Sequence, residues 1–440
     1  MFGELKWLFL TAIAASCEII IVKGSQATIA FCGPLSSCQR QRPATSLQAS
    51  VASWNDIESS LGNSYREDAP ISIDSVLDPS KPSYSDVRPT IFRERHGWCP
   101  YSERVWLTLE LGGIDYDTIR IDNTGGPRPS YFGGQTPQMK WPDGRVQGES
   151  MDLVDRLDQD YACQLQSDQA NVQDCISQFR NIFPRARPSS RAAYLFQYNG
   201  EPLWKSTFHE TLQGTNDLLG QTDGPFFCGN DLTAADVAWA PFLERYRYQL
   251  PCLHEGLNPA DPSAYPNVAQ WCAAMDKVPV YACRVKGDAS SWRKVLAMAG
   301  FGNAGLPSDV VRNMDARISY EQEEAKACID LDVWKDYSSS RPHVASSPHA
   351  DAASIVTRNR QAIIKDMLKR GCDKGIPTSE EEVDSSLRAL ACILLDKGEN
   401  VKDVPGLAAI AKFLDERMCV PRDMGAMSAA TIKILACELE

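Results

Sequence analysis

A cysteine followed directly by proline, within Gly97–Trp106 (GWCPYSERVW), constrains the fold of this 440-residue chain more than any other feature. Pro100 suits the first position of a helix, where its missing N–H removes no hydrogen bond. Helix-forming residues follow it, and Gly112-Gly113 provides a stop. Cys99 is therefore predicted to lie at the N-terminus of a helix.

This position predicts an unusual thiol. Backbone N–H groups and the positive end of a helix dipole stabilise a thiolate, and such sites lower a cysteine pKa from about 8.5 to about 3.5–7.5. Arg95 and His96 precede Cys99 and are expected to add positive charge. The alternative is a buried structural cysteine, which is our interpretation of most of the other cysteines.

The fifteen cysteines include no C-x-x-C pair, and the five histidines form no H-E-x-x-H sequence. These spacings argue against structural zinc, and the odd number of cysteines argues against a disulfide scaffold. We therefore expect free thiols in a reducing compartment and no metal site. His343 and His349 lie in a predicted loop and are weak metal candidates.

The segments around Cys99 predict a small α/β layer. Strands are expected at Thr90–Arg95 and Tyr116–Asp122, and two more at Gln135–Trp141 and Gly144–Gln147, around a Pro-Asp-Gly turn. A second helix is expected over Glu149–Tyr161. The order β-α-β, then β-β-α, is typical of an α/β layer of about 70 residues.

This order of elements resembles the thioredoxin-like N-terminal domain of glutathione transferases. C-P-Y-S followed by E-R-V-W is similar to the cysteine-dependent omega, lambda and dehydroascorbate-reductase classes. The resemblance implies a thioredoxin-like, glutathione-binding domain over residues 88–162 and an all-helical transferase domain over 175–290. The expected fold class is thus α/β plus all-α, with an appended helical bundle.

The resemblance also implies a site. Cys99 would be the catalytic nucleophile, and Ser102 stands where a dithiol motif has its second cysteine, so a monothiol route is expected. The loop before Thr136 is short and lacks the lysine that omega-like members use for the glycine carboxylate of glutathione. Arg128 or Lys140 would replace that lysine. The full set of implied glutathione-binding residues is Thr136, Pro137, Glu149, Ser150, Arg128 and Lys140.

Residues 224–246 contain a second signal, a Thr233-x-x-Asp236 capping box like the one in the helical domain of glutathione transferases. We expect this box to support folding and not catalysis. Aromatic residues around the predicted cleft provide a candidate co-substrate pocket, although an aromatic stripe is more often core. The pocket candidates are Tyr101, Trp204, Phe208 and Tyr246.

The N-terminal region reads as a targeting sequence. Residues 1–30 contain a short apolar run typical of a signal peptide, and residues 31–54 have no acidic residue and resemble a transit segment. Together they resemble the bipartite plastid presequences of algae with complex plastids. Secretion or the endomembrane system is the alternative, and residues 55–87 are expected to form a lead-in linker.

Beyond residue 290 the resemblance ends. Residues 291–354 predict a charged helix and a linker, and residues 355–440 predict four amphipathic helices in a helical extension of unknown role. An interaction module is the default expectation for this extension. It would bind a protein partner or a second copy of the chain.

Charge limits the function further. The net charge of −12, from 45 basic and 57 acidic residues, disfavours nucleic acid as a partner, and no mature membrane-spanning segment is expected. The leading function is a glutathione-dependent thiol transferase or reductase, acting on mixed disulfides or dehydroascorbate, with glutathione as co-substrate. The alternatives are a non-catalytic scaffold that uses the C-terminal helices and conjugation of glutathione to small electrophiles.

Overall fold

A computed structural model describes the chain from Val51 onward. The described residues are 51–62, 72–85, 87–123, 126–183, 203–299, 306–371, 374–396 and 404–439. The predicted signal peptide (1–30) and most of the transit-like segment (31–54) lie outside these residues.

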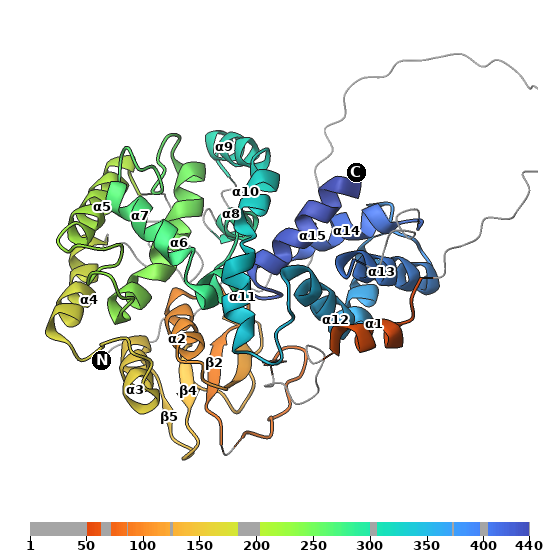
Figure 1. The fold of residues 1–440 in the computed structure, drawn as a ribbon, viewed down its shortest axis with the longest axis horizontal. Helices are drawn as coiled ribbons and strands as arrows, with labels where there is room; N and C mark the ends of the chain where they lie inside the picture. Colours follow the sequence, from red (N-terminus) through yellow and green to blue (C-terminus); the bar gives the residue numbers. More distant parts are fainter. Residues whose placement is uncertain are drawn as a thin grey trace, which may run out of the picture. The chain divides into compact units, whose positions relative to one another are not determined.

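The N-terminal part contains a five-stranded mixed sheet with the order β1-β3-β2-β4-β5 (Figure 1). Its strands are β1 (Ser72–Asp74), β2 (Thr90–Glu94), β3 (Asp117–Ile121), β4 (Gln138–Lys140) and β5 (Val146–Gln147). β1, β3 and β2 are parallel, whereas β4 and β5 join antiparallel. The predicted strands are thus present, and the lead-in segment adds β1 at the edge.

Two helices, α2 (Pro100–Leu111) and α3 (Ser150–Tyr161), contact each other, and their apolar residues share one core cluster with Ile91 of β2 and Met139 of β4. The opposite side chains of the sheet, such as Phe92, pack against Phe132 in the loop between β3 and β4. The described part of that loop contains no helix. In its described part, the chain therefore passes from β3 to β4 through a loop without an intervening helix.

The second part is helical and shares its core with α2 and α3. Its elements are α4 (Ala170–Ile182), α5 (Lys205–Leu219), α6 (Ala234–Leu253), α7 (Pro266–Met275), a π-helical turn η2 (Tyr281–Val285) and α8 (Ala289–Ala299). The predicted capping box is present at the start of α6, where Asp236 accepts the backbone N–H of Thr233 at 2.9 Å. The same carboxylate accepts the indole N–H of Trp271 at 2.9 Å and so ties α6 to α7.

The C-terminal part differs from prediction in two places. Its helices are α9 (Ser308–Ile318), α10 (Glu321–Cys328), α11 (Leu331–Ser339), α12 (Pro348–Arg370), α13 (Glu380–Leu394), α14 (Leu407–Arg417) and α15 (Ala426–Leu439). The expected single charged helix is three helices, because Asp330 starts a new one by capping α11. The expected linker ends early, because Ser347 caps α12, so His349 lies on a helix and not in a loop.

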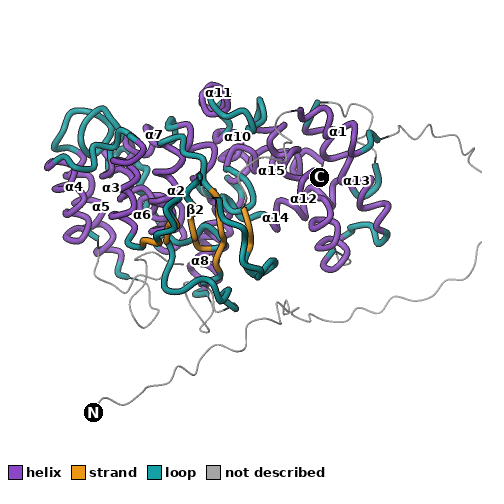
Figure 2. The backbone as a smooth tube through the Cα atoms, turned by 90° about the horizontal axis from the view of Figure 1, so that it is seen from below, coloured by secondary structure: helices purple, strands orange, loops and turns teal. Residues whose placement is uncertain are grey.

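The lead-in segment also supplies a helix to the C-terminal bundle. Residues 54–61 form α1, which lies beside α12 and α13 (Figure 2). It buries Ile57 and Leu61 in the core of the bundle. The indole N–H of Trp54 donates to Asp384 of α13 at 2.7 Å. Residues 51–62 are therefore part of a folded unit, which corrects the start of the predicted linker (55–87) and the predicted end of the transit-like segment at residue 54.

Two kinds of feature are absent from the described residues. None of the helices there combines the length and the apolar character needed to cross a bilayer. No cluster of three or more histidine, cysteine or carboxylate side chains is arranged there to hold a metal ion.

Candidate active site

Cys99 lies at the N-terminus of α2, as the sequence predicts. It is the N-cap residue, Pro100 occupies the first turn, and the Cys99 carbonyl accepts the N–H of Glu103 at 3.1 Å. Its sulfur lies 4.0 Å from the carbonyl oxygen of Thr136, which precedes Pro137 in a cis peptide bond. The structure therefore brings together two residues that are 37 positions apart in the chain.

The thiol of Cys99 is buried, with only 3% of the residue exposed. Burial raises the pKa of Cys99, and the Glu94 carboxylate contributes in the same direction. Hydrogen bonds from Ser102 and from the Tyr101 backbone N–H oppose this rise without reversing it. Burial therefore works against the expected thiolate: it raises the pKa of Cys99, although backbone N–H groups at the start of α2 lower it.

The two expected cationic neighbours do not supply free positive charge. Arg95 pairs with Asp74 of β1 at 2.7 Å. Burial, with Arg422 and Arg95 nearby, lowers the pKa of His96 to about 4. His96 is therefore neutral at pH 7, and the sequence-based expectation for these residues is corrected.

Glu149 and Ser150 lie where β5 leads into α3. Glu149 is exposed and has a positive φ of 60°, a conformation that is strained for a residue with a side chain. Ser150 is the first residue of α3 and is buried. The backbone thus places the Glu149 carboxylate directly beside the N-terminus of α3. The helix N-terminus can bind an anion.

The two candidates for the glycine carboxylate have different surroundings. Arg128 is exposed and donates to the carbonyl of Gly134 at 2.6 Å and to Asn123 at 2.7 Å. Asn123 in turn donates to the Thr136 hydroxyl at 2.6 Å. Lys140 lies instead with its ammonium 4.7 Å from the ring centre of Tyr84. Arg128 is therefore coupled to the Thr136 loop, and Asn123 is a site residue that sequence reasoning missed.

The proposed co-substrate pocket does not form as predicted. Phe208 and Tyr246 are fully buried and stack edge-to-face with ring centres 5.5 Å apart. Trp204 is 75% exposed, and Tyr101 packs against Phe242 at 6.0 Å. Phe208 and Tyr246 are thus corrected to core residues, since the helical domain closes its own core around them.

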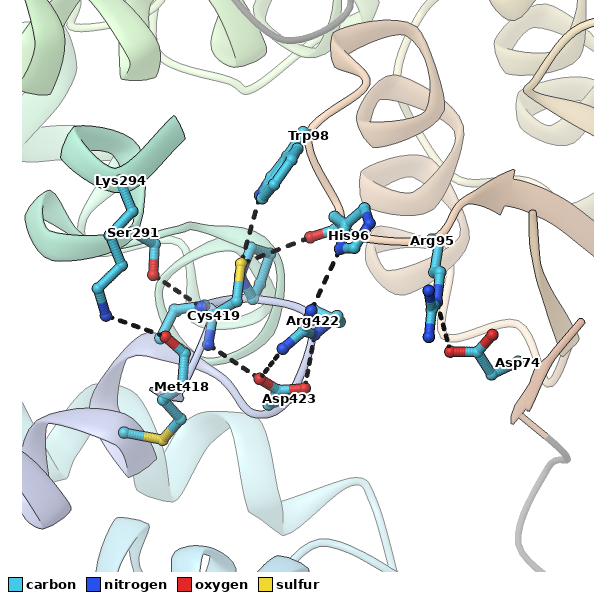
Figure 3. A network of polar contacts seen from close by, with 12 residues as sticks. Asp74, Arg95, His96, Trp98, Ser291, Lys294, Met418, Cys419, Arg422 and Asp423 are labelled. Atoms are coloured by element: carbon cyan, nitrogen blue, oxygen red, sulfur yellow. Dashed lines mark hydrogen bonds and ion pairs between the residues drawn. The ribbon is translucent and has the colours of Figure 1, made fainter. Parts of the chain in front are cut away.

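Residue Trp98, directly before Cys99, is held at three points that the sequence did not predict. Its backbone N–H donates to Glu94 at 2.7 Å, and its carbonyl accepts from Arg245 of α6 at 3.0 Å. Its indole N–H donates to the sulfur of Cys419 at 3.3 Å, from the loop between α14 and α15 (Figure 3). The C-terminal extension therefore contacts the segment that carries the candidate nucleophile.

The structure also contains a cavity with a different lining. It has a volume of about 290 Å³ and is lined by residues of α6, α8, α10 and α15, among them Arg247, Glu321 and Lys433. None of the residues predicted for the site contributes to its wall. It is therefore not the pocket that the sequence predicted.

Comparison with known proteins now adds family information. Residues 98–160 match the model of the glutathione S-transferase N-terminal domain, and residues 173–274 match that of the C-terminal domain. Both matches end before the C-terminal extension. With the observed sheet and helices, they confirm the predicted fold class: a thioredoxin-like domain, an all-helical transferase domain and appended helices.

Individual relatives cover about half of the chain. Glutathione S-transferase L3 of Arabidopsis thaliana is 26% identical over 232 residues, covering 49% of this chain and 89% of the relative. Glutathione S-transferase L2, chloroplastic, of the same plant is 28% identical over 200 residues, covering 42% of this chain and 62% of the relative. The crystal structure of Chlamydomonas reinhardtii dehydroascorbate reductase is 22% identical, with a TM-score of 0.33, covering 54% of this chain and 100% of that one.

Proposed function

We propose that this chain, with its matches to both glutathione S-transferase domains, is a glutathione-dependent thiol transferase or reductase. The names of the Arabidopsis relatives support glutathione as the co-substrate. Cys99 is the proposed nucleophile. Two classes of substrate are proposed. One is the mixed disulfides that contain glutathione, and the other is dehydroascorbate.

One observation carries this proposal: the Cys99 sulfur lies 4.0 Å from the Thr136 carbonyl, at the start of α2. The backbone of a residue before a cis-proline can pair with the cysteinyl part of glutathione. A glutathione held in this way by Thr136 would bring its own sulfur toward Cys99. The two sulfurs could then exchange.

The chemistry follows a monothiol route. The Cys99 thiolate attacks the glutathione sulfur of a mixed disulfide, and the substrate leaves as a thiol after taking up a proton. Cys99 is then disulfide-bonded to glutathione. A second glutathione thiolate attacks that bond, forming glutathione disulfide and restoring Cys99. Ser102, in the position of a resolving cysteine, has a hydroxyl and cannot take this second step.

The remaining groups of glutathione have proposed partners in the same area. Glu149 would bind its ammonium group, and Ser150 with the N-terminus of α3 would bind its γ-glutamyl carboxylate. We assign the glycine carboxylate to Arg128, because its guanidinium already contacts the loop that carries Thr136. Lys140 is less suited, since its ammonium lies over Tyr84.

A non-catalytic scaffold is the second candidate, and the burial of Cys99 favours it. A thiol that is 3% exposed, with a pKa raised by burial, is a slow nucleophile unless a ligand or a local motion opens the site. In this reading the transferase domains keep their fold, and the C-terminal helices bind a partner. The two candidates differ in a single measurable quantity, the turnover that depends on Cys99.

The test measures that turnover in the full-length protein. The substrate is the mixed disulfide of glutathione and 2-mercaptoethanol, and product glutathione disulfide is followed with glutathione reductase and NADPH. We expect Cys99→Ser to abolish turnover and the Cys99–glutathione adduct seen by mass spectrometry. Cys437→Ser, at the exposed cysteine, is the matched control and should retain both. Equal turnover in wild type and Cys99→Ser would remove the enzymatic proposal.

We propose a plastid location on separate grounds. Residues 1–54 resemble a bipartite presequence, and one relative is named as chloroplastic. A fusion of residues 1–50 to a fluorescent protein, expressed in an alga with complex plastids, should label the plastid. Label in the secretory pathway would support the alternative address.

A further inference from the structure

The loop between α14 and α15, residues 418–424, lies against residues 96–98, the segment that leads into Cys99 (Figure 3). The Cys419 sulfur contacts the His96 carbonyl at 3.9 Å and accepts the Trp98 indole N–H at 3.3 Å. The ring of Pro421 lies 3.5 Å from the position that a Cβ on Gly97 would occupy. Contacts from one loop thus reach three consecutive residues before Cys99.

A charged pair strengthens this contact. Arg422 donates to the Nδ1 atom of His96 at 3.1 Å, and the His96 ring stacks on that of Trp98 with centres 4.4 Å apart. Asp423 holds Arg422 at 2.7 Å and accepts the backbone N–H of Cys419 at 2.9 Å. Contacts within the loop therefore fix the position of Arg422, which in turn contacts the His96 ring stacked on Trp98.

The same loop is anchored firmly to the helical domain. The backbone N–H of Val420 donates to Ser291 at 2.8 Å, and Lys294 donates to the Met418 carbonyl at 3.3 Å. Trp98, Trp292, Val295 and Cys419 form a small buried cluster. At Gly425, an added Cβ would lie 1.7 Å from the Cys283 carbonyl oxygen, so only glycine permits this close approach.

These contacts act on Cys99 through Trp98. The backbone of Trp98 is held by Glu94 and Arg245, which belong to the transferase domains. Its side chain is held by Cys419, which belongs to the extension. Since Trp98 and Cys99 are adjacent, release of the indole would allow the Cys99 backbone to shift relative to Thr136.

We infer that residues 418–424 are a positioning element for Cys99, so that the C-terminal extension is part of the catalytic unit. This inference rests on the proposed function for its effect on turnover. Its structural content, that the extension holds the segment that carries the Cys99 thiol, stands without that function. The inference does not require the predicted role of the extension as a partner-binding module.

The test compares two readouts in full-length protein: alkylation of Cys99 by iodoacetamide, followed by peptide mass spectrometry, and turnover of the glutathione mixed disulfide. Cys419→Ala removes the acceptor for the Trp98 indole, whereas Cys419→Ser keeps one. Gly425→Ala separates the loop from η2. We expect Cys419→Ala and Gly425→Ala to raise the alkylation rate severalfold, because a released Cys99 segment exposes its thiol, and to lower turnover. Cys419→Ser should restore much of the wild-type alkylation rate and of the wild-type turnover.

Ser379→Ala is the matched control, because it removes the cap of α13 in the same bundle but lies outside the loop. It should behave as wild type. Unchanged alkylation in Cys419→Ala would overturn the inference, and so would a rise in both alkylation and turnover, which would make the loop a cover and not a positioning element. If wild type shows no turnover, the proposed function fails, while the alkylation readout still decides whether the extension acts on Cys99.

A second inference comes from a different pair of thiols. Cys175 of α4 and Cys228, in the loop before α6, have their sulfurs 3.8 Å apart, and both residues are partly exposed. A disulfide needs a sulfur separation of about 2.05 Å, which requires a small approach of the two side chains. In the structure the Cys228 thiol donates to the Cys175 sulfur. As a thiolate, Cys228 would accept a hydrogen bond from Cys175 instead, which lowers the pKa of Cys228 and makes it the better attacking thiol.

We propose that Cys175 and Cys228 form a reversible disulfide by exchange with glutathione disulfide. The Cys228 thiolate attacks one sulfur of glutathione disulfide and releases one glutathione. Cys175 then loses its proton and attacks the Cys228 sulfur, which releases the second glutathione. Two protein thiols are oxidised, and one glutathione disulfide is reduced to two glutathiones.

The test incubates the full-length Cys99→Ser protein with glutathione disulfide and maps disulfides by mass spectrometry without reduction. This background makes the result independent of the proposed catalysis. We expect a Cys175–Cys228 link that excess glutathione reverses. Cys272→Ser, at a buried cysteine, is the control and should keep the link. Persistence of both thiols under excess glutathione disulfide would overturn the proposal.

Discussion

Arg245 of α6 lies 2.7 Å from Glu103 of α2, with both side chains almost fully buried, and joins the helical domain to the helix that carries Cys99. The same guanidinium donates to the carbonyls of Trp98 and Pro241. One arginine thus ties the two domains together next to the candidate nucleophile. This relationship leads to the first prediction.

Arg245→Met should strongly destabilise the protein, because it removes the buried partner of Glu103, whose pKa burial already raises to about 8 while Arg245 lowers it. Breaking a buried ion pair in this way costs about 3–5 kcal/mol. Chemical denaturation should show this loss in the free energy of unfolding. Arg245→Met combined with Glu103→Gln removes the isolated charge, so it should recover part of the stability; a double variant no better than the single one would contradict this account.

The alkylation rate of Cys99 should rise with pH well into the alkaline range. The thiolate is the reactive form, and burial raises the pKa of Cys99, so half-maximal reactivity should lie above that of an ordinary cysteine. Ser102→Ala removes a hydrogen bond that lowers this pKa, and it should shift the profile further upward without changing the limiting rate. A profile centred below neutral pH would show that the helix terminus outweighs burial.

His96 should make the protein more sensitive to acid. Its pKa is lowered to about 4 in the folded state, whereas an unfolded histidine has a pKa of about 6.5. Between these values the unfolded chain binds more protons, so stability is present above pH 6.5 and declines as the pH falls toward 4. His96→Gln should weaken this decline, as measured by unfolding at several pH values. A His96→Gln variant that keeps the wild-type decline would contradict this account.

Phe208→Ala should reduce stability and leave the substrate KM unchanged. Phe208 is fully buried against Tyr246, and the loss of a buried phenylalanine costs about 3–5 kcal/mol. Trp204→Ala should have little effect on stability, because Trp204 is 75% exposed. A selective rise in KM for Phe208→Ala would restore the pocket that the sequence predicted.

The mature N-terminus should lie before residue 51. Ile57 of α1 is buried in the core of the C-terminal bundle, and Arg388 donates to the carbonyls of Val51 and Ala52. Ile57→Ala should cost about 2–5 kcal/mol of stability. N-terminal sequencing of the protein purified from its source organism should find a start upstream of Val51, and a start beyond Leu61 would contradict the role of α1.

Much of the fold was predictable, because it depends on local signals. The Cys99-Pro100 pair predicted the start of α2, and Thr233 with Asp236 predicted the start of α6. Gly and Pro punctuation separated the strands of the sheet. These features depend on backbone preferences within a few residues, so the sequence contains them directly.

The surroundings of the site were less predictable. Periodicity identifies the face of a helix that is buried but not the element that covers it. Nothing local to Phe208 or Tyr246 distinguishes a core residue from a pocket residue. Nothing near Cys419 indicates that it contacts Trp98, which is 321 positions away.

The sequence alone therefore determined the position of Cys99 at a helix start and the order of elements around it. The tertiary structure decided the ionisation state of its thiol, since desolvation sums over every group packed around the sulfur. It also decided that α1 joins the C-terminal bundle and that residues 418–424 meet the segment before Cys99. These outcomes depend on contacts between distant segments, which are formed only when the whole chain packs.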